Sequence, residues 1–416
     1  MNPYLVFILC VILLGYLLEL VVSLLNLGSL KADLPGEFSD VYDQEEYARS
    51  QEYTRVTTRF SLVHETIMTP LIVFFILVGG FNWIDQLARS FTLAPIPTGL
   101  IFTGLLLLFT GAVGLPFSIY STFVIEERFG FNRTTPKTFV LDIVKSLVLG
   151  GLIGGPLLAF VLWFFQVGGA YAWLYCWAAV VVFVFTMQFL APVVIMPLFN
   201  KFTPLADGEL KESITRYADR QQFAMKGIYT MDGSKRSTRL NAFFTGFGRF
   251  RRIVFFDTLM EKLGTGEIVA VLAHEMGHFK LKHIFRMMGA SIVQMGIMFF
   301  ILSLFLHNRG LFDAFAMEHL SIYASLVFFG FLYSPISTLM SIVFNIFSRR
   351  HEYQADRYAV QTIGRRRDLI SGLKKLSVTN LSNLSPHPLN VFLNYSHPPI
   401  LQRIEAIRKV EVENGC

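Results

Sequence analysis

The residues with the clearest chemical potential lie in one short stretch, His-Glu-Met-Gly-His. His274 and His278 are four residues apart, so in a helix both imidazoles lie on one face, as two ligands of one metal ion must. Glu275 follows the first histidine and is placed to take a proton from a water that the metal activates. This arrangement is typical of zinc-dependent peptide hydrolysis, so we expect one Zn²⁺ per chain.

The segment around this motif has the features of a helix that could hold both imidazoles in place. Thr265 is the predicted N-cap, and Glu267 lies in the first turn, where a negative charge is favourable. Apolar residues follow at helical spacing: Ile268, Val271, Leu272, Met276 and Phe279. The pattern therefore predicts a partly buried helix through the motif.

A zinc site of this kind needs a third protein ligand, and the residues next to the motif do not provide it. The metzincin pattern requires a glycine and a histidine where this chain has Leu281 and Ile284. His283 is five residues after His278 and faces another side of the helix. The intramembrane site-2 type would place the motif in an apolar span, but charged residues surround it here: Glu261, Lys262, Glu267, Lys280 and Lys282. The remaining option is a carboxylate on a later helix.

A later segment offers two carboxylates, Glu352 and Asp356, which share a helical face because they are four residues apart. With Glu352 as third ligand and Asp356 as its neighbour, the site becomes His-His-Glu. The alternative is a solvated pair of acids near the membrane, balanced by Arg349, Arg350 and Arg357. Because the two histidines of the motif need a third protein ligand, we favour the metal site over the solvated pair.

The rest of the chain has the composition of a membrane protein. Of its 416 residues 53% are hydrophobic and only 16% are charged, against roughly 25% charged in soluble domains. Seven apolar stretches approach the ~20 residues that a membrane helix needs. They are 4–27, 67–84, 99–123, 139–165, 171–199, 285–306 and 322–347. Gly79 and Gly80 interrupt the second, which makes it the weakest. We therefore expect a mainly α, polytopic membrane protein with seven transmembrane helices.

The distribution of Lys and Arg tests this count, because cytoplasmic loops are enriched in them. The segments after spans one, three, five and seven hold 32 of the 36. The N-terminus and the remaining loops hold two, Arg89 and Arg309. We therefore expect the N-terminus outside and the zinc site on the cytoplasmic side. Basic residues beside spans contact lipid headgroups, so membrane lipids are expected partners and nucleic acid is not.

The spans divide the chain into four parts. Residues 1–199 hold spans one to five, and 200–284 form a cytoplasmic segment with the motif. Residues 285–347 hold spans six and seven, and 348–416 form a second, mostly helical cytoplasmic segment that completes the zinc site. The two cytoplasmic segments are expected to build a small α+β metallopeptidase domain.

Within the first cytoplasmic segment the sequence predicts three elements. Asp207 is the expected N-cap of a helix that ends near Gln222. Residues 227–231 are expected to form a strand. The runs 239–244 and 252–257 flank Gly246 and Gly248 and predict a hairpin.

Beyond these patterns the chain resembles a known family. The pairing of His-Glu-x-x-His with Glu-x-x-x-Asp is similar to that of gluzincin peptidases. The sequence around both motifs resembles the integral-membrane CAAX prenyl endopeptidases of type I. The similar passages keep the family's order through most of the chain: 123–132, 198–205, 232–237, 241–243, 267–278, 352–356 and 395–399. The resemblance implies that His274, His278 and Glu352 hold zinc and that Glu275 activates the water.

The resemblance implies further roles. Asp356 would support the site, His397 would steady the oxyanion beside the scissile carbonyl, and Arg403 would pair with the site carboxylates. The backbone at Asn241 and Ala242 would bind the substrate peptide as an added strand. The spans would enclose a hydrated intramembrane chamber. Polar residues inside the predicted spans fit such a chamber, although each can equally join two helices: Glu19, Asp142, Lys145, Gln188, Gln294 and Asn345.

The sequence thus predicts a membrane-embedded zinc metalloendopeptidase for peptide or protein substrates. By resemblance it removes the C-terminal tripeptide of prenylated CAAX proteins. A second interpretation keeps the enzyme but makes it a quality-control protease for misfolded or stalled membrane proteins. A remote third is a transporter or channel with a fortuitous motif, although no paired halves are visible. The chain ends without an endoplasmic reticulum retrieval sequence, so we expect a bacterial inner membrane, with the endoplasmic reticulum as the alternative.

Overall fold

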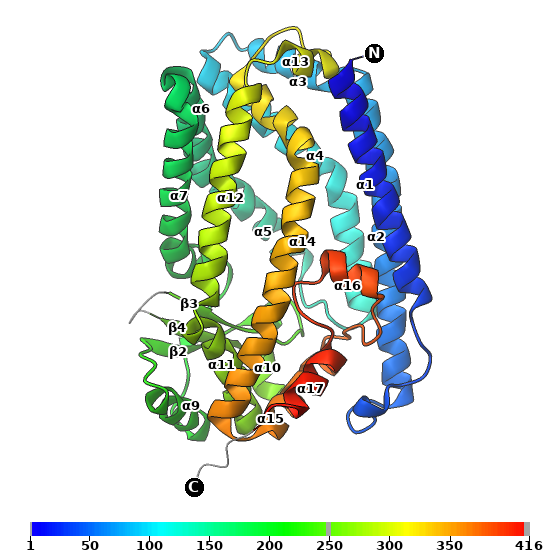
Figure 1. Cartoon of the computed structure of the whole chain (residues 1–416), viewed down its shortest axis with the longest axis vertical. Helices are drawn as coiled ribbons and strands as arrows, with labels where there is room; N and C mark the ends of the chain where they lie inside the picture. Colours follow the sequence, from blue (N-terminus) through cyan, green and yellow to red (C-terminus); the bar gives the residue numbers. More distant parts are fainter. Residues whose placement is uncertain (1, 247–250, 412–416) are drawn as a thin grey trace.

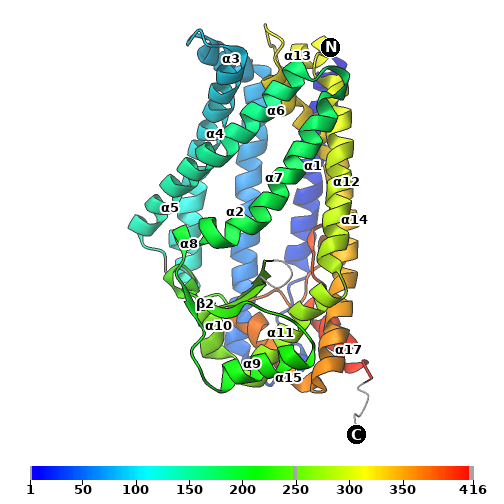
Figure 2. The same cartoon turned by 90° about the vertical axis from the view of Figure 1, so that its left-hand side faces the viewer.

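The computed structural model describes residues 2–246 and 251–411. Long helices run along the longest axis of the molecule (Figure 1). The sheet lies with α9, α15 and α17 at one end, and α3 and α13 lie at the other (Figures 1 and 2). Arg89 and Arg309, the two basic residues of the sparsely charged loops, belong to α3 and α13.

Seven helical segments among the described residues are long and apolar enough to cross a membrane, which confirms the predicted number. They are Pro3–Gly28, Gln44–Leu77, Pro95–Glu126, Pro136–Val167, Gly169–Phe199, His283–Phe305 and Ile322–Ile363. Three of them contain a π-helical turn, at Ser121–Glu126, Gly150–Gly154 and Ala191–Ile195. The helices in these segments are α1 (Pro3–Gly28), α2 (Gln44–Leu77), α4 (Pro95–Tyr120), α5 (Pro136–Leu149), α6 (Gly155–Val167), α7 (Ala172–Leu190), α8 (Met196–Phe199), α12 (His283–Phe305) and α14 (Ile322–Ile363).

The predicted bounds of the second span, 67–84, are wrong. Helix α2 begins far earlier, at Gln44, and ends at Leu77. Gly79 then adopts a φ of +74°, in the left-handed region that glycine enters without strain. Helix α3 (Gly80–Arg89) follows and buries Phe81 and Ile84 in the core at that end of the bundle. The apolar residues after Gly79 are therefore buried by a short helix and do not extend the span.

Helix α14 runs without a break past residue 347, the predicted end of span seven. Its 42 residues correspond to roughly 63 Å, about twice the thickness of the hydrocarbon core of a bilayer. The helix ends at Ile363, and the next residue, Gly364, has a φ of +72°. Glu352 and Asp356 therefore stand on a rigid extension of a membrane-length helix.

The sheet has four strands, β1 (Phe202–Pro204), β2 (Gly227–Met231), β3 (Ala242–Thr245) and β4 (Arg252–Phe256). Their order is β1-β2-β4-β3, with β2 and β4 parallel and the other pairs antiparallel. The predicted strand 227–231 and the antiparallel pairing of the two later runs are confirmed. Gly248, predicted for the hairpin turn, lies outside the described residues. Among those described, β3 is an edge strand.

Short helices complete the lobe around the sheet and the opposite end of the bundle. They are α9 (Glu209–Arg220), α10 (Asp257–Lys262), α11 (Thr265–Lys280), α13 (Arg309–Ala314), α15 (Arg366–Thr379), α16 (Pro388–Asn394) and α17 (Ile400–Arg408), with 3₁₀ turns at Gly36–Phe38, Gly169–Tyr171 and Gly233–Lys235. The core of the lobe packs α11 and α14 against the sheet and includes Ile253, Phe255 and Leu272, all fully buried.

Two predicted N-caps are wrong by one residue. Gly208, not Asp207, precedes α9, and Asp207 instead pairs with Lys211, with Oδ1 and Nζ 2.6 Å apart. Gly264, not Thr265, precedes α11. The Gly264 amide donates to the Glu267 carboxylate at 2.8 Å. A carboxylate inside the first turn thus replaces the expected Thr265 cap.

The motif helix α11 lies directly against α14. A Cβ on Gly277, within the motif, would stand 3.1 Å from the Ala355 Cα and 3.2 Å from its carbonyl oxygen. Any larger residue would force the two helices apart. The glycine between the two motif histidines therefore permits the close crossing that brings α11 to the carboxylates of α14.

Candidate active site

Three side chains from the crossing of α11 and α14 converge on one point. The Nε2 atoms of His274 and His278 are 3.2 Å apart. The Glu352 carboxylate faces both, with Oε2 3.4 Å from His274 Nε2 and Oε1 3.2 Å from His278 Nε2. One ligand atom from each of the three residues lies within 4.8 Å of the others, so this set could hold a metal ion.

The chemistry of this cluster fits a metal ion better than a hydrogen-bonded network. Glu352 is 3% exposed, and among the described residues its buried Oε2 atom accepts no hydrogen bond of good geometry, although Arg403 Nη1 lies 3.2 Å away. A buried carboxylate oxygen in that state is costly unless a cation satisfies it. Two imidazole nitrogens and one carboxylate oxygen are a donor set that zinc favours.

Asp356 and Arg403 surround the ligand His274. The Asp356 carboxylate accepts from His274 Nδ1 at 2.8 Å, so the lone pair of Nε2 is free to face the cluster. Arg403, from α17, donates to Asp356 from Nε at 2.9 Å and from Nη2 at 2.7 Å. Its Nη1 lies 3.2 Å from Glu352 Oε2. The three contacts of Arg403 together hold the carboxylates of Asp356 and Glu352 in position.

Electrostatics around His274 favour a cation at this point. Burial lowers the pKa of His274, but its hydrogen bonds to Asp356 and Glu352 outweigh burial and raise the pKa to about 9. Burial likewise lowers the pKa of Arg403, whereas Asp356 and Glu352 raise it above its ordinary value. The two carboxylates therefore attract positive charge strongly even with one guanidinium already present.

Glu275 and His397 are the more accessible members of the site. Glu275 is half-buried, and among the described residues its carboxylate has no hydrogen-bond or ion-pair partner, so both oxygens are available. His397 lies in the loop before α17, with its Nε2 3.5 Å from Glu352 Oε1. Its side chain is 65% exposed, so it can reach a bound substrate.

A cavity of about 610 Å³ opens beside His397. Residues from both ends of the sequence line it, including Tyr53 from α2, Arg239, Asn380 and Tyr395. Arg239 donates to the Glu126 carboxylate at 2.9 Å and to the Tyr53 hydroxyl. The cavity wall is therefore partly polar, and an ionic contact between Arg239 of the lobe and Glu126 of a membrane-length segment helps to hold it.

Asn241 and Ala242 lie at the start of the edge strand β3. The Asn241 carbonyl accepts from the Phe256 amide of β4 at 3.0 Å. Because backbone groups alternate along an antiparallel strand, those of Ala242 and Phe244 face the open edge. The Ala242 amide accordingly makes no contact with β4 and donates to the Asn241 side chain at 2.9 Å. The edge is thus suited to an added strand.

Sequence reasoning missed Asn380, which fixes the chain just before this edge. Its side chain accepts from the Leu240 amide at 3.0 Å and donates to the Leu240 carbonyl at 3.2 Å. An asparagine amide that pairs with both groups of one residue acts like a neighbouring strand. No local pattern in the sequence marks it, because Asn380 follows α15, 140 residues away.

Sequence reasoning also passed over His283, which it excluded as a ligand without assigning a role. His283 is 2% exposed and lies behind His278, with the Nδ1 atoms of the two rings 3.2 Å apart. On its other side its Nε2 is 2.8 Å from the side-chain oxygen of Gln354. Because an amide oxygen only accepts, His283 carries its proton on Nε2 and accepts from His278 Nδ1. This chain of contacts leaves His278 Nε2 unprotonated, as a metal ligand must be.

We therefore expect Gln354→Leu to weaken zinc affinity by about tenfold or more, because the hydrogen bond that sets the ring tautomers is lost. Gln354 is solvent-exposed, so the substitution should not unfold the protein. Zinc affinity is measured by competition with a chromophoric chelator. Gln354→Glu keeps an acceptor oxygen and serves as the matched control, with affinity near that of the wild type. Equal affinity in the leucine variant would contradict the assignment.

The fold and this cluster together define a class of protein. The His-His-Glu set, with the carboxylate of Glu275 beside it, lies where α11 meets the extension of the membrane-length helix α14. Seven segments of the described chain are long and apolar enough to cross a membrane. That combination is characteristic of an integral-membrane metallopeptidase.

Comparison with known proteins identifies the family. Residues 23–201 match the model of the CAAX prenyl protease N-terminal region with five membrane helices, and residues 204–411 match peptidase family M48. The chain belongs to this family of membrane metallopeptidases. It is 36% identical to the CAAX prenyl protease 1 homolog of Arabidopsis thaliana, over 94% of each chain. It is 37% identical to CAAX prenyl protease 1 of Saccharomyces cerevisiae, over 90% of this chain and 88% of that one.

A solved structure shows the same fold. The crystal structure of S. mikatae Ste24p superimposes with a TM-score of 0.91 at 35% sequence identity, covering 98% of this chain and 99% of that chain. The chain is therefore a multi-pass membrane metalloendopeptidase that acts on peptide or protein substrates, and the predicted family resemblance is confirmed.

Proposed function

We propose that this chain is a zinc metalloendopeptidase that cleaves near the C-terminus of prenylated proteins. The observation that carries the proposal is the convergence of His274, His278 and Glu352, with the unpaired carboxylate of Glu275 beside them. One zinc ion per chain would be held by those three residues. When bound, it supplies Lewis acidity, which acidifies water and stabilises negative charge on oxygen.

The protein's own side chains would carry the proton transfers. Glu275 accepts the proton of the attacking water and passes it to the leaving amine, a task that needs an accessible carboxylate. His397, exposed and next to Glu352, donates toward the oxygen on which negative charge develops. Asp356 holds the His274 ring through Nδ1, and Arg403 holds both carboxylates in position.

The substrate would bind as an extra strand on the open edge of β3. The outward backbone groups of Ala242 and Phe244 satisfy the amides of an extended peptide, which lines up a scissile bond with the metal cluster. Asn241 sits at the start of this edge, where its side chain already covers the Ala242 amide. Asn380 keeps the preceding residue from moving when a peptide binds.

The relatives support a prenylated substrate, because those named above are CAAX prenyl proteases. The decisive assay compares a farnesylated C-a-a-X peptide with its unprenylated twin, using the purified protein in liposomes. We expect hydrolysis of the farnesylated peptide to release its C-terminal tripeptide with a higher kcat/KM than that of the unprenylated twin. Equal rates on both would make the lipid incidental and favour the quality-control alternative. Zinc content near zero would remove the peptidase proposal and favour a transporter or channel.

We propose that the zinc site faces the cytoplasm. Basic residues are concentrated in the loops on the site's side of the spans, whereas Arg89 and Arg309 are the two at the other end. The same basic residues would contact anionic lipid headgroups. A bacterial inner membrane and the endoplasmic reticulum would both orient the site in this way, and the eukaryotic origin of the relatives named above favours the second. Labelling of single cysteines placed near positions 89 and 262 tests the orientation.

We also propose that the four segments expected from the sequence form two parts, a membrane chamber and a catalytic lobe. Segments 1–199 and 285–347 would enclose a hydrated chamber, while 200–284 and 348–416 would form the catalytic lobe. Two polar residues of the spans already contact the lobe. Asp142 pairs with Arg236 at 2.7 Å, and Asn345 donates to the Leu393 carbonyl. These contacts would tie the chamber wall to the catalytic elements.

A further inference from the structure

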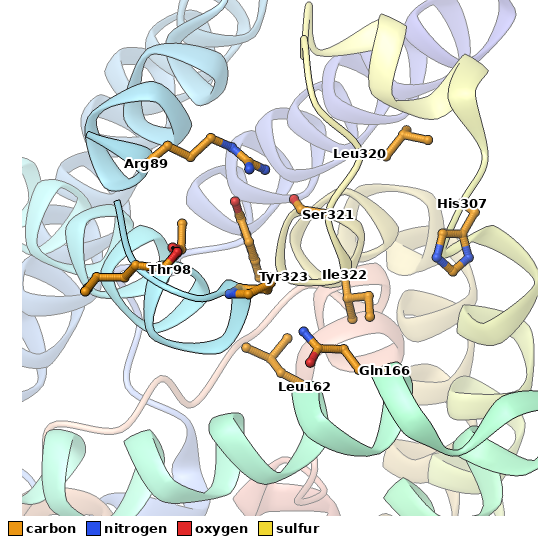
Figure 3. Close-up of a pocket in the computed structure, with 11 residues that line it drawn as sticks. Arg89, Thr98, Leu162, Gln166, His307, Leu320, Ser321, Ile322 and Tyr323 are labelled. Atoms are coloured by element: carbon orange, nitrogen blue, oxygen red, sulfur yellow. The ribbon is translucent and has the colours of Figure 1, made fainter. Parts of the chain in front are cut away.

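A second cavity lies at the end of the bundle opposite the metal cluster. Its volume is about 360 Å³, and Figure 3 shows the side chains that surround it. Arg89, Gln166, His307, Ser321 and Tyr323 supply its polar groups, and Leu162 and Ile322 contribute to its apolar wall. None of these residues belongs to the catalytic site, so the cavity needs an explanation of its own.

Arg89 is held so that its terminal nitrogens remain available. Its Nε donates to the carboxylate of Asp85 at 2.7 Å, and the Tyr323 hydroxyl donates to the other oxygen of Asp85 at 2.5 Å. Asp85 is fully buried, which makes this pair rigid. Neither Nη atom of Arg89 donates a hydrogen bond to any described residue. The four N–H groups of the two Nη atoms therefore remain for a ligand.

Three more polar groups line the cavity without a hydrogen bond to any described residue: the hydroxyl oxygen of Ser321 is buried, whereas Gln166 and His307 are exposed. Figure 3 shows Gln166 directed from below toward Tyr323 and Ile322, and Arg89 and Ser321 above. The buried Ser321 oxygen without a partner, beside the fixed guanidinium of Arg89, is most simply explained by a polar ligand, toward which the exposed Gln166 and His307 can turn.

The cavity lies at the level where lipid headgroups are found. Helix α4 begins at Pro95, α14 begins at Ile322 and α6 ends at Val167, so the ends of membrane-length helices surround it. Nearby apolar side chains are exposed, among them Trp83 at 64% and Leu93 at 49%. An exposed tryptophan at the end of a span is typical of the membrane interface.

We propose that this cavity binds the phosphate of a phospholipid headgroup. Arg89, Gln166, His307 and Ser321 supply N–H and O–H donors, and a phosphodiester offers the matching acceptor oxygens. The cavity is larger than one phosphate ion, because it has room for on the order of ten waters at ~30 Å³ each. Asp85 balances the charge of Arg89, so zwitterionic and anionic phospholipids should both bind. This proposal does not depend on the peptidase function.

The test measures lipid binding to the intact, delipidated protein by native mass spectrometry. The key variant is Arg89→Gln/Asp85→Asn, which removes the guanidinium without leaving a buried charge and keeps an acceptor for Tyr323. Arg309→Gln/Asp313→Asn is the matched control, since that exposed pair, 2.9 Å apart, lies at the same end but outside the cavity. Should the key variant misfold, Gln166→Leu/Ser321→Ala removes two donors and keeps the ion pair.

We expect phosphatidylethanolamine and phosphatidylglycerol to bind the wild type and the control equally. The key variant should bind both about tenfold more weakly, the loss expected for one charge-assisted hydrogen bond. Diacylglycerol, which lacks the phosphate, should not compete. Competition by millimolar inorganic phosphate would keep the phosphate site but assign it to the free ion. Unchanged phospholipid binding in the cavity variants, or equal competition by diacylglycerol, would overturn the proposal.

Discussion

Replacing Glu275 with glutamine is expected to lower kcat by about 10²–10⁴-fold, the usual contribution of a general base. The amide keeps the size of the carboxylate but cannot take a proton from water. Glu275 contributes no atom to the His274, His278 and Glu352 set, so the variant should still bind one zinc ion per chain. Turnover is measured with the C-a-a-X peptide, and zinc content by elemental analysis of the same sample.

The matched control for this experiment is Glu261→Gln. Glu261 is an exposed glutamate of the nearby helix α10, and the same change there removes one charge without touching the cluster. Its kcat should equal that of the wild type. Peptidase activity that survives in the Glu275 variant, at unchanged zinc content, would show that another group removes the proton.

The second large effect is expected on stability. Arg403→Leu removes the guanidinium that contacts Asp356 through two hydrogen bonds and Glu352 at 3.2 Å. Asp356 is 1% exposed and would keep only its contact with His274 Nδ1 to compensate its buried charge. Breaking one partner of a buried pair costs about 3–5 kcal/mol. For a protein of this size we expect the midpoint of thermal unfolding to fall by about 3–6 °C.

Two further variants separate this effect from a general loss of charge. Lys409→Leu removes a cation from an exposed pair at the C-terminal end of the same helix and should leave the unfolding midpoint unchanged, because water screens such pairs. Arg403→Leu/Asp356→Asn removes the stranded charge and should recover part of the loss. An unfolding midpoint in the double variant no higher than in Arg403→Leu would show that the stranded Asp356 charge is not the cause.

The sequence predicted local secondary structure well, but it predicted few of the contacts between side chains. The 227–231 strand and the membrane-length helices follow from residue type and period, and the structure contains them. The second span was misplaced because its apolar run crosses Gly79, and apolar residues can be buried by protein as well as by lipid. Both predicted N-caps failed by one residue, and at α11 the reason is that the Glu267 carboxylate accepts from the Gly264 amide, so that a glycine can stand at the cap.

In the candidate site, too, some residues were predictable from their spacing and others were not. Two histidines four apart on one helix define half of a metal site without any tertiary contact, and Glu352 and Asp356 share a face for the same reason. The contacts of His283 with Gln354 and of Asn380 with Leu240 join residues 71 and 140 positions apart. No periodicity links such positions, so residue spacing alone could not assign them a role.

By itself, then, the sequence determined the helical faces, the number of spans and the donor types, because these depend on spacing and on transfer from water to an apolar phase. Only the tertiary structure decided how α11 approaches α14 and which protons point away from the cluster. That approach depends on Gly277 lying against Ala355, where one added carbon would separate the helices. A metal site tolerates errors of only a few tenths of an ångström, and packing, not pattern, sets distances on that scale.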